Sequence, residues 1–131
     1  MKKSFNRSIE SLSDVYEFTE GVLAANDIGD AVKFPVHLAM EELFVNMVEY
    51  HPESSEDIVL EVEAEDGKVS VTMRDFDVEP FDVTAPSTPD TDAALEERTP
   101  GGLGLYLIQT MVDNLEYNYE DRRSTVRFTK E

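Results

Sequence analysis

The fold is decided by residues 58–75, which read IVLEVEAEDGKVSVTMRD. Apolar and polar side chains alternate on both sides of Asp66-Gly67, as they do in strands with one buried face. Asp-Gly is a favoured two-residue hairpin turn, because glycine tolerates a positive φ. We therefore expect an antiparallel hairpin that presents one apolar face to the core. The expected core positions are Ile58, Leu60, Val62, Ala64, Val69, Val71 and Met73.

Two helices are expected before this hairpin. Apolar residues recur at helical spacing from Ile9 to about Ala25, and Asn26 to Asp30 then read as a helix exit and turn. A second helix is expected from near Pro35, a residue suited to a first turn, to about Tyr50. His51-Pro52 ends it. Ser4 to Ile9 is expected to form a short edge strand.

A long loop, a third helix and a second hairpin follow. Four of the six prolines lie between Asp75 and Pro100, and a loop of this length in a compact domain is usually functional or disordered. The third helix opens at Gly101 to Gly104. Expected buried positions are Leu105, Ile108, Met111 and Val112 in this helix, and Leu115, Tyr117, Tyr119, Val126 and Phe128 in the strands. Paired hairpins with helices on one face predict an α+β fold, a two-layer α/β sandwich.

The composition excludes several classes of protein. The 131 residues suit one domain, and the absence of cysteine rules out disulfides and thiol chemistry. A formal charge of −18 repels nucleic acid and suits a basic protein partner. Without a membrane-length apolar run, and without a signal peptide in Met1 to Arg7, we expect a cytoplasmic protein with no membrane or direct nucleic-acid contact. A nucleotide site in such a field needs a cation or backbone amides.

Glu42 and Asn46 stand four residues apart in the second expected helix, so they share one face. An amide oxygen can ligate Mg²⁺, which prefers oxygen ligands. A carboxylate one turn away can orient or deprotonate a nucleophile that attacks a phosphoryl group. The alternative is a pair of polar residues on a solvated helix face. Spacing alone does not choose between the two.

Asp75 ends the second strand of the first hairpin. An aspartate there can accept a hydrogen bond from a purine amine, although a solvated acidic turn is the alternative. The alternating carboxylates of this segment also suggest a calcium loop. An EF-hand needs glycine sixth and glutamate twelfth, where this chain has Pro80 and Pro86, so that interpretation fails.

Glycines at residues 101, 102 and 104 stand at the start of the third helix. Glycine lets a backbone approach an anion closely, and the free amides of a helix start attract phosphate. The alternative is a flexible joint at the end of a loop. A Rossmann site or a P-loop is excluded, because the helix follows a loop rather than a strand and the Walker lysine is absent.

The order of these motifs resembles a known superfamily. Glu-x-x-x-Asn, a strand ending in Asp, a long loop and Gly-Gly-Leu-Gly-Leu resemble the N-box, first glycine box, ATP lid and second glycine box of the GHKL (Bergerat) ATPases, over about Val36 to Lys130. Pro80 to Asp82 and Glu96 to Gly104 resemble the anti-sigma-factor serine/threonine kinase branch. The resemblance implies one ATPase domain over residues 1–131, a mostly antiparallel mixed sheet with helices on one face, and a lid over about 83–100.

The resemblance also implies roles for individual residues. Glu42 would be the general base that activates a serine or threonine hydroxyl, and Asn46 would ligate the Mg²⁺ that bridges the ATP phosphates. Asp75 would recognise the adenine amine, supported through a water by Thr125. The remaining implied phosphate contacts are Arg98 and the backbone amides of Gly101, Gly102, Leu103, Gly104 and Leu105.

Three positions depart from the family pattern. Asp77 and Glu79 stand where the first glycine box has glycine, and they add bulk and negative charge where the backbone should pass a nucleotide. Tyr50 stands where a histidine or similar residue is usual.

Three functions therefore stay open. The resemblance implies an ATP- and Mg²⁺-dependent kinase that phosphorylates an anti-anti-sigma STAS-domain partner and sequesters a sigma factor by partner switching. A homodimer is implied on the same basis. The second function is that of a GHKL-fold binding regulator with weak turnover or none, and the third is a structural interaction protein unrelated to nucleotides.

Overall fold

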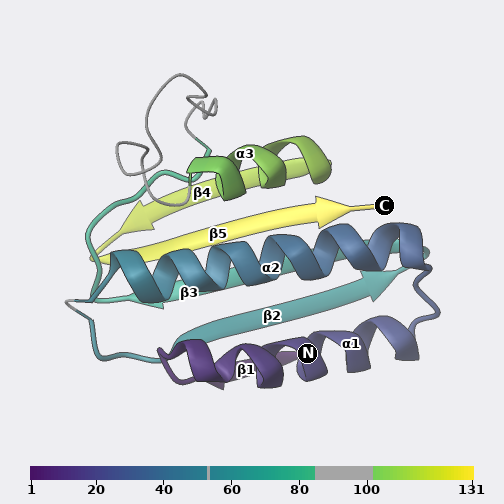
Figure 1. Cartoon of the computed structure of the whole chain (residues 1–131), viewed down its shortest axis with the longest axis horizontal. Helices are drawn as coiled ribbons and strands as arrows, with labels where there is room; N and C mark the ends of the chain where they lie inside the picture. Colours follow the sequence, from purple (N-terminus) through teal and green to yellow (C-terminus); the bar gives the residue numbers. More distant parts are fainter. Residues whose placement is uncertain (53, 85–101) are drawn as a thin grey trace.

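The computed structural model describes residues 1–52, 54–84 and 102–131. The described strands form one five-stranded sheet in the order β1-β2-β3-β5-β4, and three α-helices cover one of its faces (Figure 1). The strands are β1 (Lys2–Phe5), β2 (Ile58–Glu65), β3 (Lys68–Phe76), β4 (Asn114–Glu120) and β5 (Arg123–Lys130). The helices are the 3₁₀ turn η1 (Ile9–Ser11) and the α-helices α1 (Leu12–Ala25), α2 (Asp30–Tyr50) and α3 (Gly102–Met111). The predicted two-layer α+β sandwich is confirmed.

The β2–β3 hairpin has the predicted turn and register. Asp66 has φ of 53° and Gly67 has φ of 80°, and two positive values at a two-residue turn match the twist of the flanking strands. Val62 pairs with Val71 in the antiparallel ladder. The apolar face of the hairpin is fully buried under the helices, apart from the half-buried Ala64 near its turn.

The N-terminal elements differ in detail from the prediction. The edge strand β1 ends at Phe5, and the 3₁₀ turn at Ile9–Ser11 leads into α1. The Ser8 side chain accepts a hydrogen bond from the Glu10 amide and so caps this turn. In the apolar pattern of this segment, Ile9 and Tyr16 are 44% and 54% exposed, so only part of it faces the core.

Helix α2 begins at Asp30 rather than near Pro35, so the predicted start was wrong. The Gly29 carbonyl accepts from the amides of Val32 and Lys33 at 3.0 and 2.9 Å, which starts the helix before the proline. Pro35 is buried inside α2, where its fixed φ still suits a helix. Its missing amide leaves the carbonyl of Ala31, an exposed residue, to water.

The C-terminal hairpin places β5 between β3 and β4. Its two-residue turn, Asp121-Arg122, has φ of 51° and 61°, again positive at both positions. All four neighbouring strand pairs are antiparallel, with no parallel pair among the described strands. Phe128 of β5 and Phe44 of α2 are the largest fully buried side chains of the core. Within the described residues, no helix has the length and apolar character needed to span a bilayer.

Candidate functional site

The candidate residues lie where the second half of α2, the end of β3 and the start of α3 converge (Figure 1). Asn46 on α2 is only 5% exposed, and Glu42 one turn earlier is half-buried. Leu43 and Met47 are buried beside them, as expected for the core side of the helix. The pair therefore does not lie on a solvated helix face, which was the alternative left open by the spacing.

Glu42 lies directly against the start of α3. A Cβ atom on Gly104 would lie 2.9 Å from Cδ of Glu42 and closer still to its Oε2, so the carboxylate occupies the space that glycine leaves free. The first amides of a helix lack intrahelical acceptors and carry a partial positive charge, which favours an anion there. Because Gly104 has no side chain, the Glu42 carboxylate can lie beside the start of α3, a region suited to phosphate.

Burial raises the pKa of Glu42, and the neighbouring negative charges of Glu41 and Glu49 add to the increase. A carboxylate with a raised pKa is a better proton acceptor in its ionised form than an ordinary surface glutamate. The environment of Glu42 is therefore suited to a general base.

Asn46 and Asp75 line one small cavity. Its volume is about 10 Å³, room for roughly one water molecule. The polar and aromatic residues around it include Asn46, His51, Asp75, Phe81 and Ser124, with Val83 beside them. The side-chain nitrogen of Asn46 is buried without a hydrogen-bond partner among the described residues. Buried amides rarely stay unpaired, so this NH₂ group fits the role of a hydrogen-bond donor to an incoming anion such as phosphate.

An amide flip exchanges the oxygen and nitrogen of Asn46 without moving the rest of the side chain. Its oxygen can therefore face the cavity and offer Mg²⁺ the hard ligand that this ion requires. Asn46 is therefore a candidate ligand for a metal ion at this cavity.

Asp75 is held by an arginine that the sequence reasoning missed. Arg7, from the segment after β1, forms an ion pair with the Asp75 carboxylate, and the two side chains are 7% and 0% exposed. The other guanidinium nitrogens donate to the Met47 carbonyl at 2.9 Å and the Glu56 carbonyl at 3.2 Å. His51 Nε2 lies 3.8 Å from the second carboxylate oxygen. The Asp75 carboxylate, which was expected to bind the adenine amine, is therefore paired with the Arg7 guanidinium in this structure.

Asp77 and Glu79, the two acidic residues at glycine-box positions, are both bound by Arg122. Its guanidinium donates to Asp77 at 2.9 Å and to Glu79 at 3.0 Å, and its single positive charge offsets part of their combined negative charge. Asp77 has φ of 58°, the left-handed conformation that a glycine would adopt easily and that aspartate tolerates better than most residues. Asp77 therefore keeps the left-handed backbone conformation that a glycine at this position would favour.

Residues 78–84 lie beside the cavity and are held there by contacts with α2, α3 and β4. Phe81 stacks on Tyr50 with ring centroids 5.0 Å apart, and its amide donates to the Tyr117 hydroxyl at 3.0 Å. The Gln109 side chain donates to the Val83 carbonyl at 2.9 Å. Since Phe81 and Val83 both line the cavity, this segment narrows it to its present volume.

The structure does not bring every predicted residue together. Thr125 pairs with Arg74 in the β3–β5 ladder, whereas Ser124 is directly opposite Asp75. Because strand side chains alternate, the hydroxyl beside Asp75 belongs to Ser124, which is buried and lines the cavity. Gly102, Leu103 and Leu105 lie in the first turn of α3 beside Gly104. Arg98 and Gly101, with most of the expected lid, lie outside the described residues.

The comparisons with known proteins identify the family of the chain. The family described as the histidine kinase-like ATPase domain matches residues 5–130, so the chain belongs to that family and to the GHKL superfamily. Among solved structures, the Acinetobacter baumannii histidine kinase AdeS has a TM-score of 0.53 and 10% sequence identity. The match covers 100% of this chain and 67% of that one, and at this identity it shows the fold alone. No curated protein sequence matches the chain.

The Glu42→Gln substitution is expected to raise the melting temperature at neutral pH by about 1–3 °C. The folded state binds a proton at Glu42 more tightly than the unfolded chain, because the pKa is raised on folding. Charged Glu42 therefore opposes folding above its folded-state pKa, and the gain should vanish as the pH falls through that value. Calorimetry from about pH 8 to about pH 4 checks this. Glu17→Gln on α1 is the control for net charge, and an equal gain at every pH would contradict the prediction.

The Gly104→Ala substitution is expected to push the Glu42 carboxylate outward with little loss of stability. The atoms that must move are the free end of a flexible side chain, and alanine favours a helix by about 1 kcal/mol over glycine. NMR titration should show the pKa of Glu42 falling toward its ordinary value. Gly21→Ala in α1, where a Cβ meets nothing within 4 Å, should leave that pKa unchanged. An unaltered titration of Glu42 in Gly104→Ala would show that the contact is unimportant.

Proposed function

We propose that this domain binds ATP with Mg²⁺ and acts as a protein serine/threonine kinase of the anti-sigma type. The observation that carries the proposal is the placement of Glu42 against Gly104, with Asn46 one turn further along α2 and facing the same cavity as Asp75. In this proposal α2 would supply both the base and the metal ligand, β3 would supply the purine acceptor, and the start of α3 would supply amides for the phosphates.

The chain's own residues have separate tasks in this proposal. Bound ATP with Mg²⁺ would supply the transferable phosphoryl group. Asn46 would hold the metal, and the amides at the start of α3 would orient the phosphates. Glu42 would take the proton from the attacking serine or threonine hydroxyl, a role for which its raised pKa is suited.

The proposed partners are a STAS-domain protein as phosphoacceptor and a sigma factor as the sequestered target, with a second copy of the chain in a homodimer. Support comes from the resemblance of the motifs to that branch and from the net charge of −18, which suits a basic partner. The cytoplasmic address proposed for the domain follows from the same partners.

A second candidate function is a binding regulator that does not turn over ATP. The ion pair between Arg7 and Asp75, together with a cavity of about 10 Å³, favours it. An adenine ring needs far more room than one water. Nucleotide binding therefore requires residues 78–84 to move and Arg7 to release or share the carboxylate.

Mg²⁺ and ATP together are expected to raise the melting temperature by several degrees. A ligand at one hundred times its Kd stabilises the fold by about 2.7 kcal/mol. Asn46→Ala should lose the Mg²⁺-dependent part of this shift, whereas Glu42→Gln should keep the shift and lose phosphoryl transfer to a panel of purified STAS-domain proteins. Binding without transfer by the unmodified domain would favour the second function. No shift at millimolar nucleotide would contradict ATP binding itself.

Arg7→Gln is expected to lower the stability of the nucleotide-free domain by about 3–5 kcal/mol, because it leaves a buried carboxylate without its cation. The same variant should show a larger ATP-induced rise in melting temperature than the unmodified domain, since the competitor for Asp75 has gone. Arg127→Gln removes a half-exposed arginine 3.9 Å from Glu116 and should change stability by less than about 1 kcal/mol. If ATP raised the melting temperature of Arg7→Gln by the same amount as that of the unmodified domain, the Arg7–Asp75 ion pair would not compete with nucleotide binding.

A further inference from the structure

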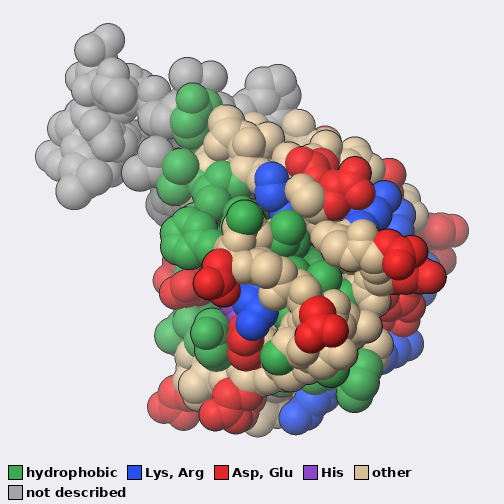
Figure 2. All heavy atoms as spheres, turned by 90° about the vertical axis from the view of Figure 1, so that its right-hand side faces the viewer, with side chains coloured by type: hydrophobic (Ala, Val, Ile, Leu, Met, Phe, Trp, Pro, Cys, Tyr) green, Lys and Arg blue, Asp and Glu red, His purple; other side chains and the backbone are tan. Residues whose placement is uncertain are grey.

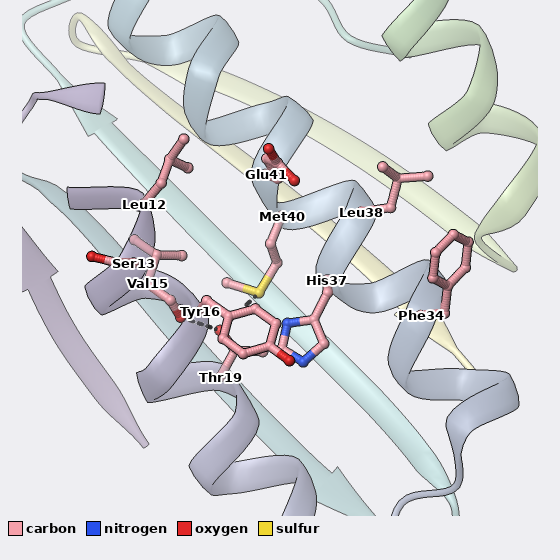
Figure 3. Close-up of a pocket in the computed structure, with 10 residues that line it drawn as sticks. All are labelled: Leu12, Ser13, Val15, Tyr16, Thr19, Phe34, His37, Leu38, Met40 and Glu41. Carbon is pink, nitrogen blue, oxygen red and sulfur yellow. Dashed lines mark hydrogen bonds between the residues drawn. The ribbon is translucent and has the colours of Figure 1, made fainter. Parts of the chain in front are cut away.

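A second hollow lies between α1 and α2, away from the residues described above (Figure 3). Its volume is about 450 Å³, within the range of sites that accept ligand side chains or small molecules. Val15, Thr19 and Met40 form its buried floor. The Thr19 hydroxyl is already bonded to the Val15 carbonyl at 2.8 Å, so the floor offers little to a polar guest. We call this hollow the α1–α2 groove.

The walls of the α1–α2 groove are apolar and held in place. Tyr16 stacks on His37 with ring centroids 4.2 Å apart, as Figure 3 shows, and His37 is 2.8 Å from Glu20. Lys33 pairs with the same carboxylate at 2.6 Å. Hydrogen bonds from Lys33 and His37 lower the pKa of Glu20, so it stays ionised and keeps this cluster together. The Tyr16 ring is thereby fixed although it is 54% exposed.

Phe34 stands at one end of the groove and is 66% exposed. Large exposed aromatic rings beside a preformed apolar hollow are typical of interaction surfaces rather than of ordinary protein surface. Neither Phe34 nor Tyr16 belongs to the buried core, whereas Val15 and Met40 of the groove floor do. These rings are therefore free to contact a partner.

The two helices around the groove are strongly acidic. Helix α1 carries three acidic residues and no Lys or Arg, and α2 carries four acidic residues and one lysine, Lys33, which is paired with Glu20. The acidic residues are Asp14, Glu17, Glu20, Asp30, Glu41, Glu42 and Glu49. Figure 2 looks at one end of the molecule, where acidic and basic side chains lie among exposed hydrophobic ones. Of the acidic residues on α1 and α2, Glu41 lines the groove itself, and the others contribute to the negative net charge of the two helices.

We propose that the α1–α2 groove binds an amphipathic helix with basic flanking residues from a partner protein. Apolar side chains one turn apart on such a helix would enter the hollow between Tyr16 and Phe34, as in other helix-in-groove complexes. Lysines or arginines beside them would meet Glu41 and the acidic residues of α1. A small apolar molecule would fill the hollow but make no use of Glu41 or of the acidic residues of α1, so charge favours the helix. The proposal is independent of nucleotide binding.

The test uses a synthetic helical peptide of about 18 residues made of leucine and lysine in an amphipathic pattern. A scrambled peptide of the same composition is the control for charge alone. Binding to the whole chain is measured by calorimetry, and the contact surface is mapped by amide NMR shifts in the unmodified domain. We expect saturable binding of the patterned peptide, shifts centred on α1 and α2, and at least tenfold weaker binding of the scrambled peptide.

Phe34→Ala should weaken the patterned peptide about tenfold, the size typical of an aromatic anchor. Because Phe34 is largely exposed, this variant should fold normally, which circular dichroism checks. Tyr106→Ala removes an aromatic ring that is 38% exposed on α3 and should leave the affinity unchanged. Glu41→Gln should weaken binding about twofold to threefold at low salt and less at high salt.

Four results would overturn the proposal. They are equal binding of the two peptides, an unchanged affinity in Phe34→Ala, NMR shifts centred away from α1 and α2, and concentration-dependent self-association that Phe34→Ala abolishes. The last result would assign the groove to a second copy of the chain.

Discussion

The buried charge of Asp75 is the constraint on which the site depends. A carboxylate with no solvent exposure is stable only when a cation and hydrogen-bond donors surround it. Arg7 provides the cation and also binds the carbonyl at Met47, so one guanidinium ties the segment after β1 to β3 and to the last turns of α2. Any ligand that uses Asp75 must compete with this network. Stability of the domain and the proposed recognition of a purine would therefore depend on the same carboxylate.

The charge of Glu42, unlike that of Asp75, has no cation from the described residues among the causes that shift its pKa. Its charge is partly desolvated and repelled by neighbouring glutamates, and both effects raise its pKa where it lies against Gly104. Groups kept in such places against stability are common at functional sites. The helix start beside Glu42 suits phosphate, and the side-chain nitrogen of Asn46 is buried without a hydrogen-bond partner among the described residues. Together these features are explained more simply by a ligand than by packing.

The local features of the fold could be predicted because they depend on neighbours in the chain. The alternation of β2 and β3 and the Asp66-Gly67 turn are of this kind, and so is the spacing of Glu42 and Asn46. The start of α2 was missed because Pro35 is tolerated beyond the first turn. Arg7 could not be foreseen, since it meets Asp75 across 68 positions of sequence and only the sheet order brings them together.

The residue opposite Asp75 illustrates a related difficulty. Thr125 and Ser124 are adjacent in sequence, and either hydroxyl suits a supporting role. A shift of one position in strand register moves a side chain to the other face of the sheet, so only the β3–β5 pairing identifies Ser124. The sequence likewise did not indicate that Phe81 and His51 line the cavity. Their place there depends on how residues 78–84 pack over α2.

A crystal structure of the domain with Mg²⁺ and a non-hydrolysable ATP analogue tests the central claim most directly. The account predicts the Asn46 side-chain oxygen on the metal, phosphate oxygens at the amides beginning α3, and Asp75 turned from Arg7 toward the purine amine. A nucleotide bound elsewhere, with the Arg7 and Asp75 pair intact and the cavity still closed, would contradict it.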